Sequence, residues 1–356
     1  MRILVNALSG IGDALMFSPL LKLLKVKLPN HDIDIMVMFK SVSEMFRYSP
    51  YISNIYFIDF LKQPKTDSLR QLVELRRKKY DISINVYPSN RLEYNLVNYF
   101  IGASKRLGHK YTHPGFFRGE FLNNKPVREK KNRHNVLQNL DLIKQIIDVQ
   151  DDELNGLEVF LNENEENSAK LWLTKTGIAE GNLIGFHAGS ALLKNHIHKR
   201  WDYRKYAELG NLLLDKYKSQ ILLFGTETEL NNKINELMGG RAIYASTNNY
   251  MDSMARLKLC RLFVSNDTAF LHSAAAFDVP TAAIFGYTNY RELFPWKNRH
   301  VIIRKELDCS PCFYNSPKPA SCRWTGDEEF KCIKEIDINE VFKACEKLLE
   351  GDGTIN

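Results

Sequence analysis

The sequence predicts an α/β protein made of two doubly wound parallel-sheet domains. Three observations support this prediction. Short apolar strands alternate with helical segments in both halves of the chain, as expected for parallel sheets covered on both faces. Each half contains a strand that turns directly into a helix next to small residues. The length of 356 residues suits two domains of about 150 to 180 residues each.

In the first half, apolar runs and helical spacing define the expected elements. The expected strands are residues 2–7, 32–39, 55–60 and 81–87, and the expected helices are 15–28, 42–48 and 67–79. We predict that this first domain covers residues 1–170.

The alternation restarts in the second half. The expected strands are residues 182–187, 220–225, 262–265 and 281–285, and the expected helices are 203–217 and 229–238. We predict a second domain at 171–335, and a closing segment, 336–356, whose helix packs back towards the first domain.

Composition excludes two classes of protein. With 44% hydrophobic and 26% charged residues, the chain is neither disordered nor membrane-embedded, and no apolar run approaches the roughly 20 residues that cross a bilayer. The amino terminus enters a strand without the pattern of a signal peptide. We therefore expect a cytoplasmic protein, with at most peripheral contact with the inner face of the membrane.

The net charge of +7 is concentrated between residues 91 and 133, where ten Lys or Arg face three acids. Such a block is usually a solvated face, but it can also attract an anionic partner. Nucleic acid is not expected, because no recognised nucleic-acid module accompanies the block.

The segment Ser9–Leu15 follows the first strand. Gly10 and Gly12 permit a tight turn and a close approach of ligand to backbone N–H groups. Asp13 lies in the first helical turn, where it is either a helix cap or a general base for a hydroxyl. The third glycine of a dinucleotide fingerprint is missing, which disfavours a nicotinamide oxidoreductase.

The segment 265–276 repeats this design in the second half. Asp267 and Thr268 end a strand and open an alanine-rich helix, a place where open α/β folds bind phosphorylated ligands. Helix capping is the alternative role of Asp267.

Two further loops follow strands. The first runs from His187 to Ser190 and continues to three cations, Lys194, Lys199 and Arg200, which would suit a phosphate clamp. The second carries Glu227 and Glu229, either of which could accept a hydrogen bond from a ribose hydroxyl or be a solvated acid at a helix start.

The cysteines form a separate pattern. Cys309, Cys312, Cys322 and Cys332 have the spacing C-x2-C-x9-C-x9-C. They are either ligands of a structural Zn or Fe or four reduced thiols, whereas Cys260 and Cys345 lie in apolar settings and are expected to be buried.

In this order, these segments resemble glycosyltransferase family 9, the ADP-heptose transferases of the lipopolysaccharide inner core. The resemblance rests on G-I-G-D-A-L-M-F-S-P-L-L, G-F-H-A-G-S with K-R-W, F-G-T-E-T-E, S-N-D-T-A-F-L-H-S-A-A-A and F-G-Y-T-N. It implies a GT-B fold, with two Rossmann-like lobes facing across a cleft. It also implies inverting transfer from a nucleotide sugar, ADP-heptose, without a cofactor for catalysis.

The resemblance also implies roles for individual residues. Asp13 matches the proposed base, Ser190 and Lys199 the phosphate loop, and Glu229, or else Glu227, the ribose contact. Asp267 matches the acid that holds the sugar, while Thr268, Ala269 and His272 line the diphosphate. Ala269 departs from the glycine that is usual in the family.

We expect an anionic acceptor, a glycolipid or a protein, to contact Gly12, Arg91, Lys105, Arg106 and Lys110. The alternatives are a protein heptosyltransferase of the autotransporter type with metal on the four cysteines, a transferase for another nucleotide sugar, and a nucleotide-binding protein without activity.

Overall fold

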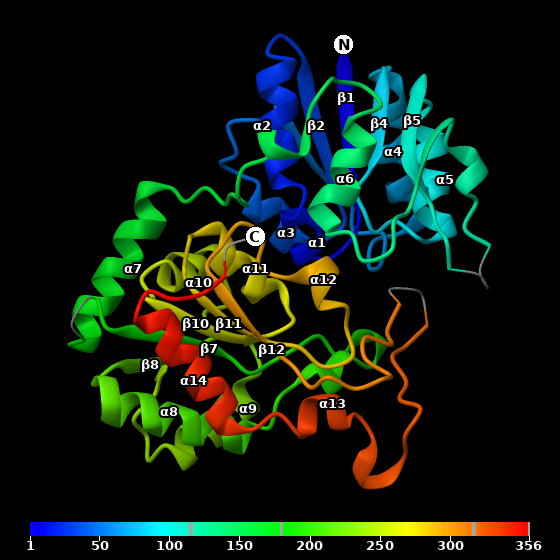
Figure 1. The fold of residues 1–356 in the computed structure, drawn as a ribbon. Helices are drawn as coiled ribbons and strands as arrows, with labels where there is room; N and C mark the ends of the chain where they lie inside the picture. The colour runs from blue at the N-terminus through cyan, green and yellow to red at the C-terminus, as the bar shows by residue number, and fades with distance from the viewer. Residues whose placement is uncertain (114–116, 179–180, 315–317, 355–356) are drawn as a thin grey trace. The chain divides into compact units, whose positions relative to one another are not determined.

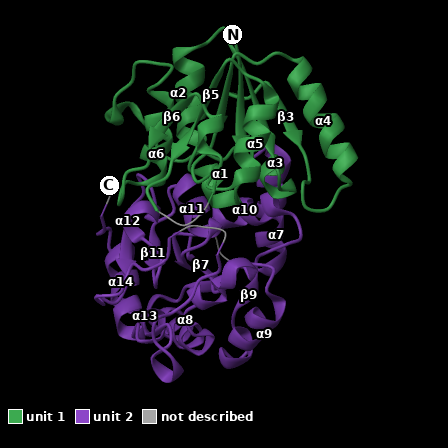
Figure 2. Cartoon of the chain, turned by 90° about the vertical axis from the view of Figure 1, so that its right-hand side faces the viewer, with its two compact units in different colours: residues 1–160, 315–317 green, residues 161–314, 318–356 purple. Residues whose placement is uncertain are grey.

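The computed structural model describes residues 1–113, 117–178, 181–314 and 318–354. These fall into two compact units, which are coloured separately in Figure 2. Unit 1 comprises residues 1–160, and unit 2 comprises the described residues from 161 onwards.

Unit 1 is built on a six-stranded sheet in the order β3-β2-β1-β4-β5-β6, and all its strand pairs are parallel. The strands are β1 (Arg2–Ala7), β2 (Asp32–Val37), β3 (Asn54–Phe57), β4 (Ile82–Asn85), β5 (Lys105–Lys110) and β6 (Lys125–Arg128). The helices are α1 (Ile11–Leu15), α2 (Ser18–Lys27), α3 (Lys40–Met45), α4 (Lys65–Arg77), α5 (Leu92–Ile101) and α6 (Asn135–Ile143), and a 3-10 turn, η1, covers Glu120–Leu122.

Unit 2 repeats this plan with the order β12-β11-β10-β7-β8-β9, again with parallel pairs only. Its strands are β7 (Leu183–His187), β8 (Gln220–Leu223), β9 (Ile243–Tyr244), β10 (Leu262–Asn266), β11 (Thr281–Ile284) and β12 (His300–Ile303). Its helices are α7 (Glu163–Thr176), α8 (Tyr203–Tyr217), α9 (Thr228–Leu237), α10 (Tyr250–Leu257), α11 (Ala269–Ala276), α12 (Tyr290–Leu293), α13 (Lys331–Lys334) and α14 (Ile338–Leu349). Two 3-10 turns of unit 2 cover Leu193–Lys199 and Gly326–Glu328, and a further one in unit 1 covers Asp151–Glu153.

The central strands of both sheets are buried because helices cover both faces (Figure 1). Every residue of β4, β7, β10 and β11 is buried, as parallel sheets of α/β proteins require. In each sheet the chain first winds towards one edge and then returns to add strands on the other side of the first strand. The direction reverses between β1 and β4 in unit 1 and between β7 and β10 in unit 2. Open α/β sheets bind ligands beyond the carboxyl ends of the strands at such a switch point.

Two predicted segments lie elsewhere than expected. The predicted boundary at 170 cuts α7, which belongs to unit 2 as a whole. The helix is held there by the Leu173 side chain in the core of unit 2 and by Arg256, whose guanidinium lies 4.3 Å from the ring centre of Trp172.

The closing helix α14 was expected to pack against the first domain, but it packs in the core of its own unit. Val341, Ala344, Cys345 and Leu348 join the same buried cluster as strands β10 and β11. The helix is strongly amphipathic, and its apolar face packs against this sheet.

Much of the basic block at 91–133 has regular secondary structure. It contains α5, β5, η1 and β6. No helix in the described part of the chain is long and apolar enough to span a bilayer.

Candidate functional site

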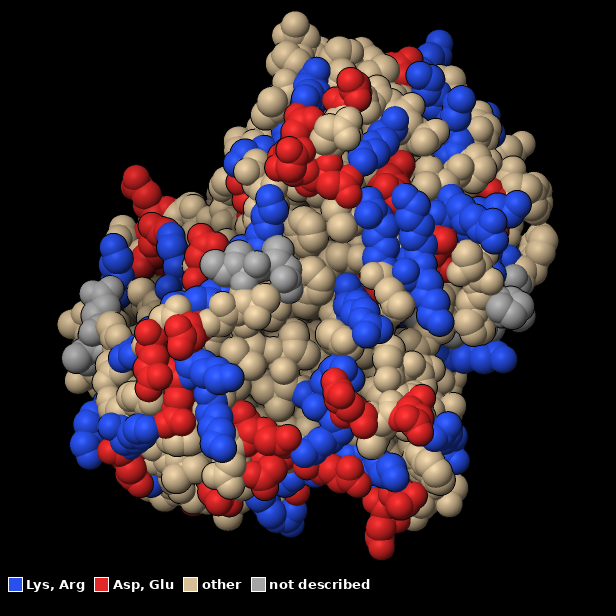
Figure 3. Space-filling model, in the orientation of Figure 1, with Lys and Arg blue, Asp and Glu red and all other residues tan. Residues whose placement is uncertain are grey.

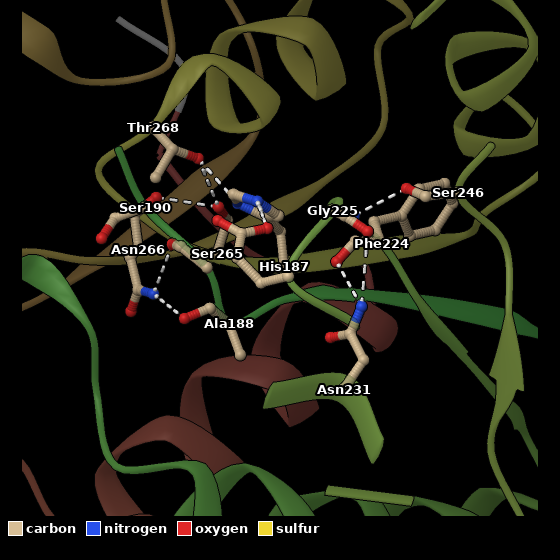
Figure 4. A network of polar contacts seen from close by, with 12 residues as sticks. His187, Ala188, Ser190, Phe224, Gly225, Asn231, Ser246, Ser265, Asn266 and Thr268 are labelled. Carbon is tan, nitrogen blue, oxygen red and sulfur yellow. Dashed lines mark hydrogen bonds and ion pairs between the residues drawn. The ribbon is translucent and has the colours of Figure 1, made fainter. Parts of the chain in front are cut away.

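The switch point of unit 2 is held together by the buried amide of Asn266, at the end of β10. Its Nδ2 donates to the carbonyls of Ala188 at 2.9 Å and Gly189 at 3.2 Å, as Figure 4 shows. Its Oδ1 accepts the backbone N–H of Trp201 at 3.1 Å. The loop after β7, the loop after β10 and the segment that carries Lys199 are therefore fixed side by side.

Lys199 and Asp267 form a buried ion pair at this point. Lys199 Nζ lies 2.7 Å from Asp267 Oδ2, and the two side chains are 16% and 5% exposed. Burial acts to raise the pKa of Asp267, but Lys199, His272 and Thr288 outweigh it and hold that pKa below its ordinary value. The carboxylate is therefore charged at neutral pH, and it keeps a cation next to the amino end of α11.

Thr268 and His187 lie next to the ion pair. Thr268 caps the start of α11, and its Oγ1 lies 2.9 Å from Nδ1 of His187 (Figure 4). Burial, with a contribution from the charge of Arg200, lowers the pKa of His187 to about 3. Since this imidazole is neutral, positive charge at the site comes from Lys199, Arg200 and the helix terminus.

Ala269 and His272 occupy the first turn of α11. Ala269 is the first residue of the helix, and His272, three residues later, is buried. Burial lowers the pKa of His272 to about 4, so it too is neutral. Its Nδ1 has no hydrogen-bond partner among the residues that the structure describes.

The predicted phosphate loop is held in shape by Arg200, one of the three candidate cations of the phosphate clamp. The Ser190 hydroxyl donates to the His196 carbonyl at 2.8 Å and accepts from Arg200 Nε at 3.1 Å. Arg200 also donates to the Ser190 carbonyl at 2.8 Å. Ser190 thus fixes the turn that leads to Lys199.

Glu229, the first choice for the ribose contact, lies away from the site. Its side chain is 86% exposed and pairs with Lys233, one turn along α9, at 2.7 Å. Helix α9 begins at Thr228, so Glu229 lies in its first turn, where its side chain points to solvent.

Glu227, its alternative, lies next to the loop that follows β7. Its carboxylate is 3.6 Å from Arg200 and 3.9 Å from His187, and its side chain is 24% exposed. Glu227 also explains two glycines, because a Cβ at Gly189 or Gly225 would collide with its carboxylate. The structure therefore replaces Glu229 by Glu227 at the candidate site.

In unit 1, Asp13 lies at the corresponding switch point. It is in the first turn of α1, directly after β1, with Gly12 before it. The Ser9 hydroxyl donates to the Pro88 carbonyl at 2.7 Å, which ties this loop to the loop that follows β4. Burial raises the pKa of Tyr94, the charge of Arg91 lowers it and the charge of Asp13 raises it. Both predicted site residues therefore lie near the Tyr94 ring.

The remaining predicted acceptor residues divide between the two ends of β5. Lys110 ends the strand opposite Arg128, at the carboxyl edge where Asp13 also lies. Lys105 begins the strand, and Arg106 donates to the carbonyls of Leu122 and Ala103. Lys105 and Arg106 therefore lie at the amino edge, about 12 to 16 Å along the strand from Lys110.

Basic side chains also gather beside α6 on the face shown in Figure 3. Among the residues near this helix, Lys130 and Arg133 both contact Asp141, at 3.0 and 2.9 Å. Part of the positive charge of the block is thus neutralised within the unit.

The four cysteines of the predicted metal centre line one cavity of about 270 Å³ in unit 2, together with aromatic residues such as Tyr287 and Trp324. Thiolate sulfur suits Zn or Fe, so the residue types fit. However, no three His, Cys, Asp or Glu side chains come within binding distance of a common ion in the described ranges. The four cysteines are therefore close together, but their side chains are not arranged around a common ion position in the part of the chain that the structure describes.

Comparisons with known proteins agree with the fold. The family model described as "Glycosyltransferase family 9 (heptosyltransferase)" matches residues 68–320. A lipooligosaccharide heptosyltransferase 2 of Campylobacter jejuni is 23% identical over 98% of this chain and 99% of its own length. A protein of the same name from Haemophilus influenzae is 26% identical over 85% of this chain and 88% of its own.

Solved structures share the fold. A glycosyltransferase family 9 protein of Veillonella parvula has a TM-score of 0.80 and 22% identity, covering 98% of this chain and 97% of its own. The Escherichia coli ADP-heptose lipopolysaccharide heptosyltransferase II has a TM-score of 0.72 and 21% identity, covering 98% and 99%. The iron-containing dodecameric glycosyltransferase TibC of Escherichia coli is more distant, with a TM-score of 0.59 and 13% identity, covering 98% of this chain and 76% of its own. The predicted GT-B fold is thereby confirmed, and the chain belongs to glycosyltransferase family 9, the heptosyltransferase family.

Proposed function

We propose that the protein is an inverting heptosyltransferase that moves a heptose from ADP-heptose to a hydroxyl of the lipopolysaccharide inner core. The observation that carries the proposal is the buried pair of Lys199 and Asp267, at 2.7 Å, beside the start of α11. Relatives that align along most of the chain are named as heptosyltransferases of lipopolysaccharide or lipooligosaccharide, which supports this choice of sugar and acceptor.

In this proposal unit 2 binds the donor. Lys199 and the backbone N–H groups at the start of α11 neutralise the diphosphate as it leaves. Asp267 holds Lys199 in place and accepts a hydrogen bond from the sugar. Thr268, Ala269 and His272 line the diphosphate, and Glu227 accepts hydrogen bonds from the ribose. Such electrostatic stabilisation of a leaving group is usually the largest contribution to catalysis.

Asp13 is the proposed general base. It takes the proton from the acceptor hydroxyl while the oxygen attacks the anomeric carbon from the face opposite the leaving diphosphate. The C–O bond to the acceptor forms as the bond to the diphosphate breaks, which inverts the configuration. General-base assistance contributes about 10² to 10⁴-fold.

The acceptor is proposed to bind at the carboxyl edge of the unit 1 sheet. Gly12 allows close approach to the backbone, and Arg91 and Lys110 attract its phosphate groups. We place the protein in the cytoplasm, with peripheral contact to the membrane that carries the acceptor.

Donor and acceptor can be tested separately. Titration calorimetry with ADP, UDP and GDP should show selective binding of ADP. Tighter binding of UDP or GDP would mean that the donor is a different nucleotide sugar, and it would leave the fold assignment unchanged. Assays with a core glycolipid and with a peptide acceptor should give transfer to the glycolipid alone. Transfer to the peptide would favour a protein heptosyltransferase.

The base assignment predicts that Asp13→Asn abolishes heptose transfer, with kcat reduced by at least about 10²-fold, and leaves ADP affinity unchanged. Asp32→Asn is the matched control, because Asp32 begins β2 at the other edge of the same sheet and is exposed. It should keep full activity. Near-normal turnover by Asp13→Asn would contradict the role of Asp13.

A further inference from the structure

A buried network of asparagine amides joins the sheet of unit 1 to helix α5. Asn6 of β1 and Asn85 of β4 lie opposite each other in the sheet, and Asn6 Nδ2 donates to Asn85 Oδ1 at 3.1 Å. Asn85 Nδ2 donates in turn to Asn95 Oδ1 of α5, also at 3.1 Å. All three residues are at most 1% exposed, and the proposed chemistry does not use them.

The Asn95 amide has a partner for each of its hydrogen-bonding positions. Its Oδ1 accepts from Asn123 Nδ2, at 2.8 Å, as well as from Asn85. Its Nδ2 donates to the Arg118 carbonyl at 2.8 Å and to the Arg91 carbonyl at 3.3 Å. An asparagine amide has two donor hydrogens and one oxygen with two lone pairs, so none is left over. Asn95 therefore ties the residue that precedes α5 to the loop that precedes η1.

The start of α5 lies at the edge of the sheet where the acceptor is proposed to bind. Arg91 precedes α5, which follows β4, and Asp13 follows the neighbouring strand β1. The hydrogen bond from Ser9 to the Pro88 carbonyl joins the two loops. Tyr94, in the first turn of α5, lies near both Arg91 and Asp13. The orientation of this first turn therefore decides where the Arg91 guanidinium lies relative to Asp13.

Helix α5 is held in the unit by amides more than by apolar side chains. Its buried residues are Asn95, Asn98 and Ile101, so two of its three buried positions are polar. Hydrogen bonds have preferred distances and directions, and buried polar groups whose hydrogen bonds are all made rigidify a core and specify one arrangement of it. The amides thus fix the rotation of α5 and its position along its axis.

We propose that Asn95 is a positioning residue of the acceptor site, which holds the carbonyls of Arg91 and Arg118 so that the Arg91 guanidinium meets an acceptor phosphate beside Asp13. The inference rests on the proposed function and deepens it. Groups that bind a substrate must be held within about 0.5 Å of their productive geometry. Asn95 is 1% exposed, so it acts through Arg91 rather than by touching the acceptor.

The test is a kinetic comparison of Asn95→Ala with its matched control, Asn98→Ala. Asn98 is three residues later on α5 and equally buried, but its amide donates to the Leu107 carbonyl and to Asn123 Oδ1. The donor is ADP-heptose, and the acceptor is a phosphorylated core oligosaccharide freed of its acyl chains. Asn95→Ala should raise the KM for this acceptor about tenfold and leave kcat and ADP affinity nearly unchanged. Asn98→Ala should leave all three unchanged.

The control separates positioning from a general loss of stability. Both variants should lose a similar amount of unfolding free energy, because each removes one buried amide and leaves its partners unpaired. A purely structural role of Asn95 would then give equal KM values. If Asn95→Ala does not fold, Asn95→Asp and Asn98→Asp take the place of the two variants. The carboxyl group keeps the shape of the amide, but at position 95 it offers at most one hydrogen to the two carbonyls.

A second measurement tests whether Asn95 acts through Arg91. Arg91→Ala alone should raise the acceptor KM about tenfold. In a chain that already carries Arg91→Ala, Asn95→Ala should raise it no further, because the group that Asn95 positions is gone.

Two results would overturn the inference while the wild type transfers heptose: equal KM values in the two asparagine variants, or a further rise in KM when Asn95→Ala is added to Arg91→Ala. Absence of transfer by the wild type to this acceptor would instead overturn the proposed function, and the inference with it. The two failures are therefore distinguishable.

Discussion

Glu227 and Glu229 are two residues apart, but of the two only Glu227 contacts His187 and Arg200. We expect Glu227→Gln to weaken ADP binding by about tenfold, because a carboxylate forms stronger hydrogen bonds to hydroxyl groups than an amide does. Glu229→Gln, its matched control, removes only a surface pair with Lys233 and should leave ADP affinity unchanged. Titration calorimetry of both variants decides the assignment. Equal losses, or a loss in Glu229→Gln alone, would return the ribose contact to Glu229.

The same two residues show how far sequence reasoning reaches at this scale. The positions of Asp267 and Thr268 follow from the strand that ends before them and the alanine-rich helix after them. The choice between Glu227 and Glu229 depends on the residue at which α9 begins, and a shift of one residue turns a side chain by about 100°. Asn266 was left out of the predicted site because its contact with Trp201 joins segments 65 residues apart. Arg200 was only one of three candidate cations, because its contact with Ser190 lies inside a loop without periodic structure.

At the scale of elements, the turn between β8 and α9 depends on Gly225. Its φ is +99°, and a Cβ there would meet the Glu227 carboxylate at 2.5 Å and the His187 ring at 2.9 Å. The Gly225 N–H donates to Ser246 at 2.6 Å (Figure 4). The glycine therefore supplies both a left-handed backbone and the space that Glu227 occupies.

We predict that Gly225→Ala lowers both the free energy of unfolding and ADP affinity. Gly240→Ala is the matched control, because Gly240 also has a positive φ, +77°, but a Cβ there meets nothing within 4 Å. The control should lose only about 1 kcal/mol of stability and keep its affinity, and Gly225→Ala should lose more. Urea unfolding and calorimetry measure the two effects, and equal behaviour of the variants would show that the Glu227 contact is unimportant.

Several of the elements that sequence reasoning missed lie in the basic block. In α5, Asn95 and Asn98 face the core and share a network of side-chain hydrogen bonds with Asn6, Asn85 and Asn123. Buried asparagines break the apolar periodicity by which helices are recognised. These asparagines can be buried only because each amide has a hydrogen-bond partner in the folded unit. The partners are far apart in the sequence, so local patterns do not reveal them.

At the scale of the whole molecule, both units have the same strand order relative to their first strand. The alternation of strands and helices predicted this doubly wound plan, and the plan then predicts where Asp13 and Asp267 lie, since each follows a strand at a switch point. The packing of α14 could not be predicted in this way, because an amphipathic stripe shows that a helix is half-buried but not which surface buries it.

Buried histidines in both units make the stability of the whole molecule depend on pH. Burial lowers the pKa of His109 in unit 1 to about 4, and the same cause holds for His187 and His272 in unit 2. Each remains neutral in the folded chain at a pH where the unfolded chain, with a His pKa of about 6.5, takes up a proton. Their contribution to stability is therefore complete above about pH 6.5 and is lost as the pH falls towards about 4.

We predict that His109→Gln reduces this acid sensitivity in unit 1. Between about pH 7 and about pH 5, the wild-type unit should lose about 2 kcal/mol of unfolding free energy through His109 alone, and the variant should not. The glutamine amide can still donate to the Gln138 carbonyl, which lies 3.2 Å from His109 Nε2, so the loss of stability at neutral pH should be small. All four Trp lie in unit 2, so Trp fluorescence would report on that unit. Urea unfolding is therefore followed by circular dichroism, which also detects unit 1. Parallel pH profiles of variant and wild type would show that His109 does not carry this dependence.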